Sequence, residues 1–174
     1  RYELETFVCD GQYEHGLQII LESFLSNIGQ AEQPAAWVSG FFGSGKSHLV
    51  KMLRALWVNT RFPDGATAQG IASLSDKIRD LLKELDGEGK RYGGLHAASG
   101  TLGAGANGSV RLSLLQIIFR SVNLPEQFPI ARFVMWMRDQ GILDSVRQMV
   151  ETEGCNWETE LDSFLFSESI HSAL

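Results

Sequence analysis

The eight residues from Gly40 to Ser47 limit the possible folds of this chain more than any other stretch. They read Gly-Phe-Phe-Gly-Ser-Gly-Lys-Ser, which fits the phosphate-binding P-loop pattern G-x-x-x-x-G-K-[ST]. Gly43 and Gly45 tolerate backbone angles that a Cβ atom would penalise, so consecutive amide N–H groups can turn toward an anion. A helix that starts after the loop would point its free N–H groups and its positive dipole end at the same anion. The sequence therefore predicts a phosphate site at this loop.

Two side chains of the loop have different predicted roles. Lys46 would reach the β- and γ-phosphate oxygens as a flexible cation. The Ser47 hydroxyl would be a ligand of the Mg²⁺ that bridges these phosphates, so the expected cofactors are ATP and Mg²⁺. The residues predicted to bind the nucleotide, through side chains or backbone N–H groups, are Gly40, Phe41, Phe42, Gly43, Ser44, Gly45, Lys46, Ser47 and His48.

The residues on either side of the loop predict a strand before it and a helix after it. Residues 35–39 form a short apolar run after Pro34, which is typical of a buried parallel strand. Residues 46–58 carry an apolar stripe at helical spacing, made of Leu49, Val50, Leu53, Leu56 and Trp57. The order favours an α/β fold, an AAA+-like P-loop NTPase with a parallel-sheet core, incomplete in this chain and followed by a helical segment. A glycine-rich turn that merely begins a helix is the alternative.

The rest of the chain divides into a predicted core and a helical segment. We expect an extended lead-in over residues 1–9, helices over 14–27, 75–86 and 109–122, a loop over 59–70 and a second central strand over 95–99. Three later apolar stripes, beginning at Phe133, Ile142 and Trp157, predict further helices. The predicted domains are a nucleotide-binding core with its lead-in helix (1–123) and a helical insert or lid (124–174).

The glycine-rich stretch from Gly103 to Gly108 matches the dinucleotide pattern G-x-G-x-x-G. We discount this match because the first glycine follows the predicted strand late. Residues 127–129 also hold no acidic residue where the ribose would need one. Two interpretations stay open: a mobile loop beside the nucleotide or a subunit interface, and a flexible connection.

The sequence assigns no catalytic residue for ATP hydrolysis. An acidic residue after a second apolar strand usually orients the attacking water, and an arginine often comes from a neighbouring subunit. Asp139 follows the apolar run 133–137, but the spacing of that run favours a helix, so the catalytic residues are unknown. A homo-oligomer is left open. Phe7, Val8 or Tyr13 would either touch the nucleotide base or simply pack.

Composition narrows the class of protein further. The net charge of −6 gives no support for a broad nucleic-acid-binding surface, although a local basic patch stays open. Cys9 and Cys155 are isolated, which favours a reducing cytoplasm over a disulfide scaffold. No apolar stretch approaches the roughly 18 residues of a membrane span. The four histidines lack metal-ligand spacing with each other or with the cysteines.

Three stretches, residues 7–15, 37–48 and 93–105, resemble the N-terminal portion of the large P-loop protein of BREX bacteriophage-exclusion systems (BrxC/PglY type). The resemblance implies a long cytoplasmic AAA+-like ATPase, of which this chain is the first part. It also implies work with other BREX components, among them a DNA methyltransferase, to block phage DNA replication. The positions that carry over as nucleotide-binding are Gly40, Gly43, Gly45, Lys46 and Ser47.

The resemblance identifies no catalytic acid or arginine finger in this chain and leaves direct DNA contact open. Two hypotheses follow. The first is an ATP-binding, ATP-hydrolysing module of a multi-component phage-defence complex. The second is a nucleotide-dependent scaffold or switch with little turnover.

Overall fold

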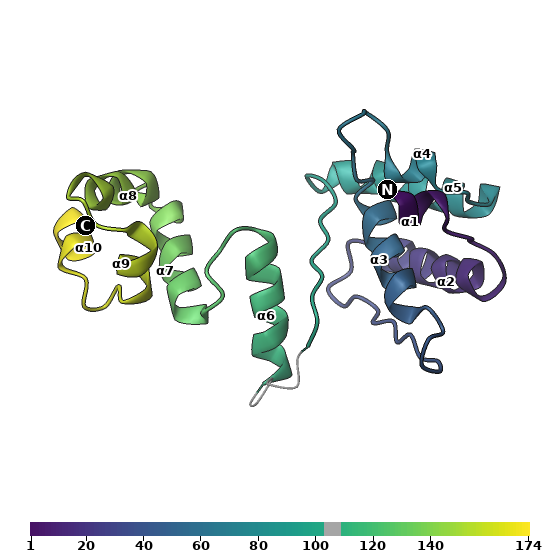
Figure 1. Ribbon diagram of the computed structural model, residues 1–174, viewed down its shortest axis with the longest axis horizontal. Coiled ribbons are helices and arrows are strands. Elements are labelled where there is room, and N and C mark those ends of the chain that lie inside the picture. The colour runs from purple at the N-terminus through teal and green to yellow at the C-terminus, as the bar shows by residue number, and fades with distance from the viewer. Residues whose placement is uncertain (103–108) are drawn as a thin grey trace. The chain divides into compact units, whose positions relative to one another are not determined.

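The computed structural model describes residues 1–102 and 109–174, and within these ranges the regular elements are helices, α1 to α10 (Figure 1). The chain divides into two compact units, unit 1 (residues 1–97) and unit 2 (residues 98–174). We expected a domain boundary between residues 123 and 124 instead. The Gly103–Gly108 stretch, for which the sequence left two interpretations, lies outside the described residues.

Unit 1 contains the predicted phosphate loop. Its helices are α1 (Tyr2–Glu5), α2 (Gly11–Asn27), α3 (Lys46–Trp57), α4 (Ala68–Ile71) and α5 (Asp76–Arg91). The helices predicted over 14–27, 46–58 and 75–86 are confirmed, with α2 starting three residues earlier and α5 ending five residues later. In the region expected to be a loop, the short helix α4 begins at Ala68.

α5 shows why these predictions succeeded. Its N-cap is Ser75, whose hydroxyl accepts a hydrogen bond from the N–H of Ile78 at 3.4 Å. Asp76 in the first turn and Lys90 and Arg91 in the last turn complement the helix dipole. One face is buried, and it packs against α2. The buried side chains of this face belong to Ile78, Leu81, Leu82 and Leu85.

The core of unit 1 forms where three helices bring their apolar stripes together. One cluster contains Leu17 and Leu21 of α2, the buried face of α5, and six residues from α1, α3 and the chain before α2. The contributions of α3 are Leu49, Met52 and Leu56. Because Leu49 lies one turn after the predicted phosphate loop, the core anchors the start of α3 and with it the loop.

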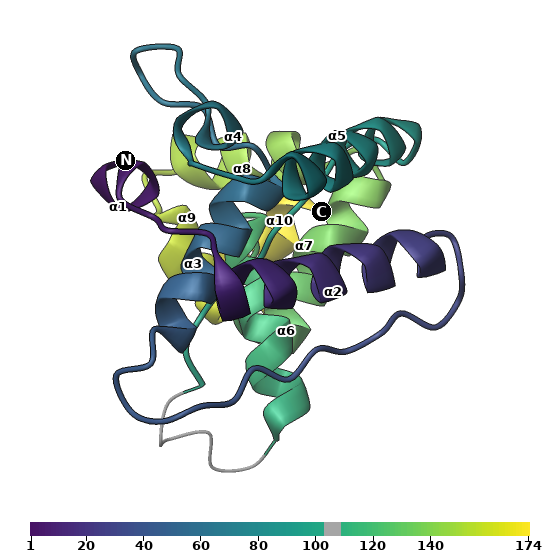
Figure 2. The same cartoon turned by 90° about the vertical axis from the view of Figure 1, so that its right-hand side faces the viewer.

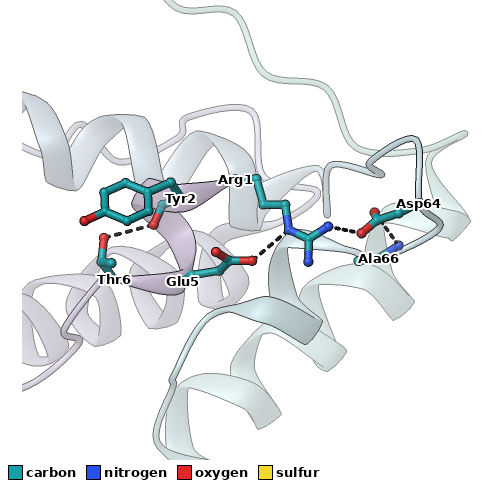
Figure 3. Close-up of polar contacts among 6 residues, drawn as sticks. All are labelled: Arg1, Tyr2, Glu5, Thr6, Asp64 and Ala66. Carbon is teal, nitrogen blue, oxygen red and sulfur yellow. Dashed lines mark hydrogen bonds and ion pairs between the residues drawn. The ribbon is translucent and has the colours of Figure 1, made fainter.

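The N-terminal residues fold back on unit 1, contrary to the expected extended lead-in. Arg1 forms an ion pair with Asp64 in the turn after α3 and donates to Glu5 at 2.7 Å (Figure 3). Asp64 also accepts a hydrogen bond from the N–H of Ala66 at 3.2 Å. The prediction was wrong for residues 2–5 because the i, i+4 pair of Arg1 and Glu5 supports one helical turn there.

Unit 2 consists of helices around a second buried cluster. They are α6 (Val110–Ser121), α7 (Phe128–Asp139), α8 (Leu143–Thr152), α9 (Trp157–Asp162) and α10 (Glu168–Ala173). Its fully buried side chains include Met137, Val150 and Ile170. The helical interpretations of residues 109–122 and of the three later stripes are confirmed, although the last stripe continues beyond the end of α9.

The predicted parallel-sheet core is wrong. Residues 1–102 and 109–174 contain no strand, and pairing outside the helices consists of isolated bridges between Val8 and Ser73 and between Arg61 and Thr67. Residues 35–39 and 95–99, the two expected strands, have no regular structure. A strand requires a neighbouring strand for its backbone hydrogen bonds. Within the described residues, no backbone hydrogen bond is recorded for residues 35–39. An apolar run alone could not supply that neighbour.

Candidate functional site

The P-loop segment, residues 40–47, joins the stretch after α2 to the start of α3. Figure 2 shows the chain turning back after α2 and running in the opposite direction before it enters α3. The N–H of Ser44 donates to the carbonyl of Phe41 at 3.2 Å and closes a turn. Gly43 and Gly45 each have φ +79°, in the left-handed region that residues with a Cβ atom rarely adopt. The glycines therefore have the backbone role predicted for them.

The start of α3 leaves several backbone donors unpaired. Its first hydrogen bond runs from the N–H of Leu49 to the carbonyl of Gly45, at 2.9 Å. The N–H groups of Lys46, Ser47 and His48 precede this bond, and no backbone acceptor within the described residues pairs with them. The first turn of α3 carries no acidic residue. This helix end therefore offers N–H groups and a positive dipole to an anion without a competing carboxylate.

The Lys46 side chain folds back over the loop. Its ammonium group donates to the carbonyls of Gly40 and Phe41, at 2.9 and 2.6 Å, and approaches the Ser44 hydroxyl at 3.3 Å. Within the part of the chain that the structure describes, Lys46 forms no ion pair, so its charge is not neutralised by a carboxylate. A positive charge therefore lies beside the free N–H groups of α3.

Ser47 and His48, the other predicted residues at the helix start, have different surroundings. Ser47 is exposed, and among the described residues its hydroxyl has no recorded hydrogen-bond partner. His48 turns away toward α1: its Nδ1 lies 3.9 Å from Glu3 Oε2, and its ring lies edge-on to Phe7 at 5.6 Å. Only the backbone N–H of His48 is therefore suited to the phosphate loop.

Glu3 fixes this side of α3. Its carboxylate accepts a hydrogen bond from the Lys51 ammonium at 2.7 Å, and this bond holds the pKa of Glu3 below its ordinary value. The Glu3 carboxylate is thus directed to Lys51 and His48. It is not paired with Lys46, which leaves the loop cation separate from this ion pair.

The aromatic residues at the front of the loop are fully open to solvent. Phe41 is 91% exposed and Phe42 is 106% exposed. The Phe41 carbonyl accepts a hydrogen bond from the Lys46 ammonium. The structure therefore keeps these two residues in the loop without giving their side chains a contact in the core.

Tyr13 contacts the loop in a way that the sequence did not predict. Its hydroxyl donates to the carbonyl of Ser44 at 2.8 Å, and its ring lies edge-on to Phe7 at 6.1 Å. Phe7 is buried in the core, so it packs, whereas Val8 is exposed. Sequence alone named all three as candidates for the nucleotide base. A tyrosine in the first turn of a preceding helix gives no signal of which carbonyl it will reach.

A pocket of about 820 Å³ lies beside Lys46, between α2, α3 and the segment before the loop. This volume is within the range of small-molecule sites. α2 contributes one wall, and the segment 34–41 contributes another. The wall from α2 consists of Gln12, Tyr13, Gly16, Ile19, Ile20, Ser23 and Phe24. Ile19 in this wall is an apolar residue outside the predicted core stripe of its helix.

Among the residues that the structure describes, no metal-binding cluster lies at this loop. Within residues 1–102 and 109–174, no three His, Cys, Asp or Glu side chains are arranged to hold a metal ion. Asp139 ends helix α7 of unit 2, which confirms the helix that the spacing of residues 133–137 favoured. Cys9 and Cys155 are both free thiols.

Comparison with known proteins adds no assignment. None of the helices in the described residues is long and apolar enough to cross a membrane. No protein-family model matches the chain, and no solved structure matches it. The candidate site therefore stands on its own geometry.

Proposed function

We propose that unit 1 binds ATP with Mg²⁺ at the P-loop segment and the N-terminus of α3. The observation that carries this proposal is the position of Lys46. Its ammonium lies over a loop with two left-handed glycines, next to a helix start whose N–H groups are unpaired. Positive charge, free N–H donors and a helix dipole in one place favour a multiply charged anion such as a triphosphate.

Phosphate binding requires only a small rearrangement of Lys46. The ammonium group has three N–H donors, and in the structure they have three acceptors, two carbonyls and the Ser44 hydroxyl. The contact with Ser44 is the longest, at 3.3 Å, and its acceptor is neutral. A phosphate oxygen is the stronger acceptor because it is charged. We therefore expect this contact to be replaced while both carbonyl contacts remain.

Ser47 and the pocket supply the remaining parts of the proposed site. The Ser47 hydroxyl is exposed next to Lys46 and suits a Mg²⁺ ion held by the phosphates. The pocket beside Lys46 is large enough for a base and a ribose, and its wall from α2 is mostly apolar. ATP, rather than inorganic phosphate alone, is therefore the proposed ligand.

The resemblance to BREX proteins implies a cellular role for this nucleotide-binding unit. By it, the chain is a nucleotide-binding module of a cytoplasmic phage-defence complex, acting with other BREX components.

ATP turnover distinguishes the two hypotheses from the sequence, an ATPase module and a nucleotide-dependent scaffold or switch. An ATPase would release phosphate in the complete complex, whereas a nucleotide-dependent scaffold would bind ATP with little release. Because the sequence leaves the catalytic residues unknown, nucleotide binding is tested first.

Binding of a labelled ATP analogue with Mg²⁺ tests the proposal. Lys46→Ala should weaken binding at least about tenfold, since a hydrogen bond to a charged group contributes roughly 1.5–3 kcal/mol. Lys51→Ala is the matched control, because it removes the same charge from the same helix at a residue that contacts Glu3. Equal affinity of the folded wild type and Lys46→Ala would contradict the proposal.

A further inference from the structure

Tyr13 is joined to the phosphate loop at one defined atom. It lies in the first turn of α2, and its hydroxyl donates to the Ser44 carbonyl at 2.8 Å. Ser44 directly precedes Gly45, the residue that caps α3 in the left-handed conformation. The contact therefore links two helices at the peptide group through which the loop enters α3.

The carbonyl of Ser44 and the N–H of Gly45 belong to the same peptide group. This group is planar and trans, so its C=O and N–H bonds point in opposite directions. A hydroxyl that holds the carbonyl toward α2 consequently turns the N–H of Gly45 away from α2. Tyr13 thus sets the direction of one of the backbone donors that a bound phosphate would use.

The Tyr13 hydroxyl is itself held in place. The Tyr13 ring lies edge-on to Phe7, which is buried in the core of unit 1 and also contacts the His48 ring. A Cβ atom at Gly45 would collide with the Tyr13 hydroxyl, whereas one at Gly43 would meet nothing within 4 Å. Both glycines have the same φ, so steric contact with Tyr13 is an additional reason for glycine at position 45 alone.

We propose that Tyr13 is a positioning residue for phosphate binding, acting through the Ser44–Gly45 peptide group. The proposal rests on the proposed function of this loop. It differs from a contact between Tyr13 and the nucleotide base, because it concerns the phosphates and operates without any base.

Two probes separate these roles: Mg²⁺-ATP and Mg²⁺-tripolyphosphate, which has the phosphates and no base. Tyr13→Phe keeps the ring and removes the hydroxyl, and we expect the affinity for both probes to fall by the same factor, about five- to tenfold. Tyr2→Phe is the control, since Tyr2 is 76% exposed in the same unit, and it should leave both affinities unchanged. Circular dichroism and thermal unfolding confirm that each variant is folded at the binding temperature.

The outcomes are distinct. Unchanged affinity of Tyr13→Phe for tripolyphosphate overturns the proposal, whether or not ATP binding weakens. The proposed function still holds in that case if Lys46→Ala fails to bind. If the wild-type chain binds neither probe, the proposed function fails and the role of Tyr13 fails with it.

Alanine at the two glycines provides a second test. Gly45→Ala should lose more affinity for tripolyphosphate than Gly43→Ala, and the loss at position 45 should shrink when Tyr13 is already phenylalanine. Such non-additivity is expected of residues in direct contact. An equal loss from Gly45→Ala with and without the hydroxyl would contradict the steric link between Tyr13 and Gly45.

Discussion

Exposed apolar segments differ in backbone structure between the two units. In unit 1, residues 35–39 form no regular structure, and Trp37 among them is 92% exposed. In unit 2, α6 is a regular helix although Phe119 is the one side chain of it that is buried. Exposed apolar residues therefore occur in both segments, and only the helix keeps a regular backbone. Its exposed members include Val110, Leu114 and Ile118.

Backbone hydrogen bonding explains the difference. A helix pairs its own N–H and C=O groups, so α6 forms with little burial of its side chains. Its N-cap Ser109 adds a bond to the N–H of Leu112 at 3.4 Å. A strand must form its backbone hydrogen bonds with another segment. An apolar pattern therefore specifies a helix from its own segment alone. It specifies a strand only when a second segment is available to pair with it.

The largest expected effect compares one tryptophan from each unit. Trp157 is 9% exposed in the cluster of unit 2, so Trp157→Ala should lower the free energy of unfolding by about 3–5 kcal/mol. Trp37→Ala should change it by less than about 0.5 kcal/mol, because an exposed side chain loses few contacts. Urea unfolding of both variants measures this. A loss of several kcal/mol at Trp37 would mean that residues 35–39 are packed in solution.

Proline substitutions test the backbone part of the comparison. Ile118→Pro should cost about 3 kcal/mol, since proline inside α6 removes a helical hydrogen bond and clashes with the preceding turn. Val38→Pro should cost far less, because no backbone hydrogen bond is recorded for residues 35–39 in the described structure. Both side chains are at least one-third exposed, so little packing changes. Thermal unfolding with circular dichroism compares the two, and equal losses would show that residues 35–39 pair as a strand.

The same distinction explains which predictions succeeded. The stripes of α3, α5 and α8 have a local cause, namely the spacing of their apolar residues, and all three helices were predicted. The left-handed conformations of Gly43 and Gly45 also follow from sequence, because a β-carbon is penalised there. The sheet was predicted from two short apolar runs and their association with the P-loop pattern. That association carries no information on which segment would pair with residues 35–39.

The candidate site divides in the same way. The left-handed conformations of the loop glycines were predictable because the motif is contiguous. The contact of Tyr13 with Ser44 was not predictable, since it depends on how α2 lies against α3. Helix packing angles follow from side chains of both partners and cannot be obtained from one stripe.

The smallest expected effect compares the asparagines that follow α3 and α6. Asn59 and Asn123 both have positive φ, 44° and 55°, a conformation that glycine adopts at lower cost. The Asn59 side chain also accepts a hydrogen bond from the N–H of Gln69 at 3.1 Å, whereas none is recorded for the Asn123 side chain within the described residues.

Asn123→Gly should therefore leave the free energy of unfolding unchanged or raise it by about 0.5 kcal/mol. Asn59→Gly should lower it by roughly 0.5–1 kcal/mol, because the lost hydrogen bond outweighs the relief of backbone strain. Paired urea titrations resolve a difference of this size when both variants share one unfolding slope. If both variants were stabilised equally, the Asn59 contact with Gln69 would contribute nothing, and the ends of α3 and α6 would be governed by backbone conformation alone.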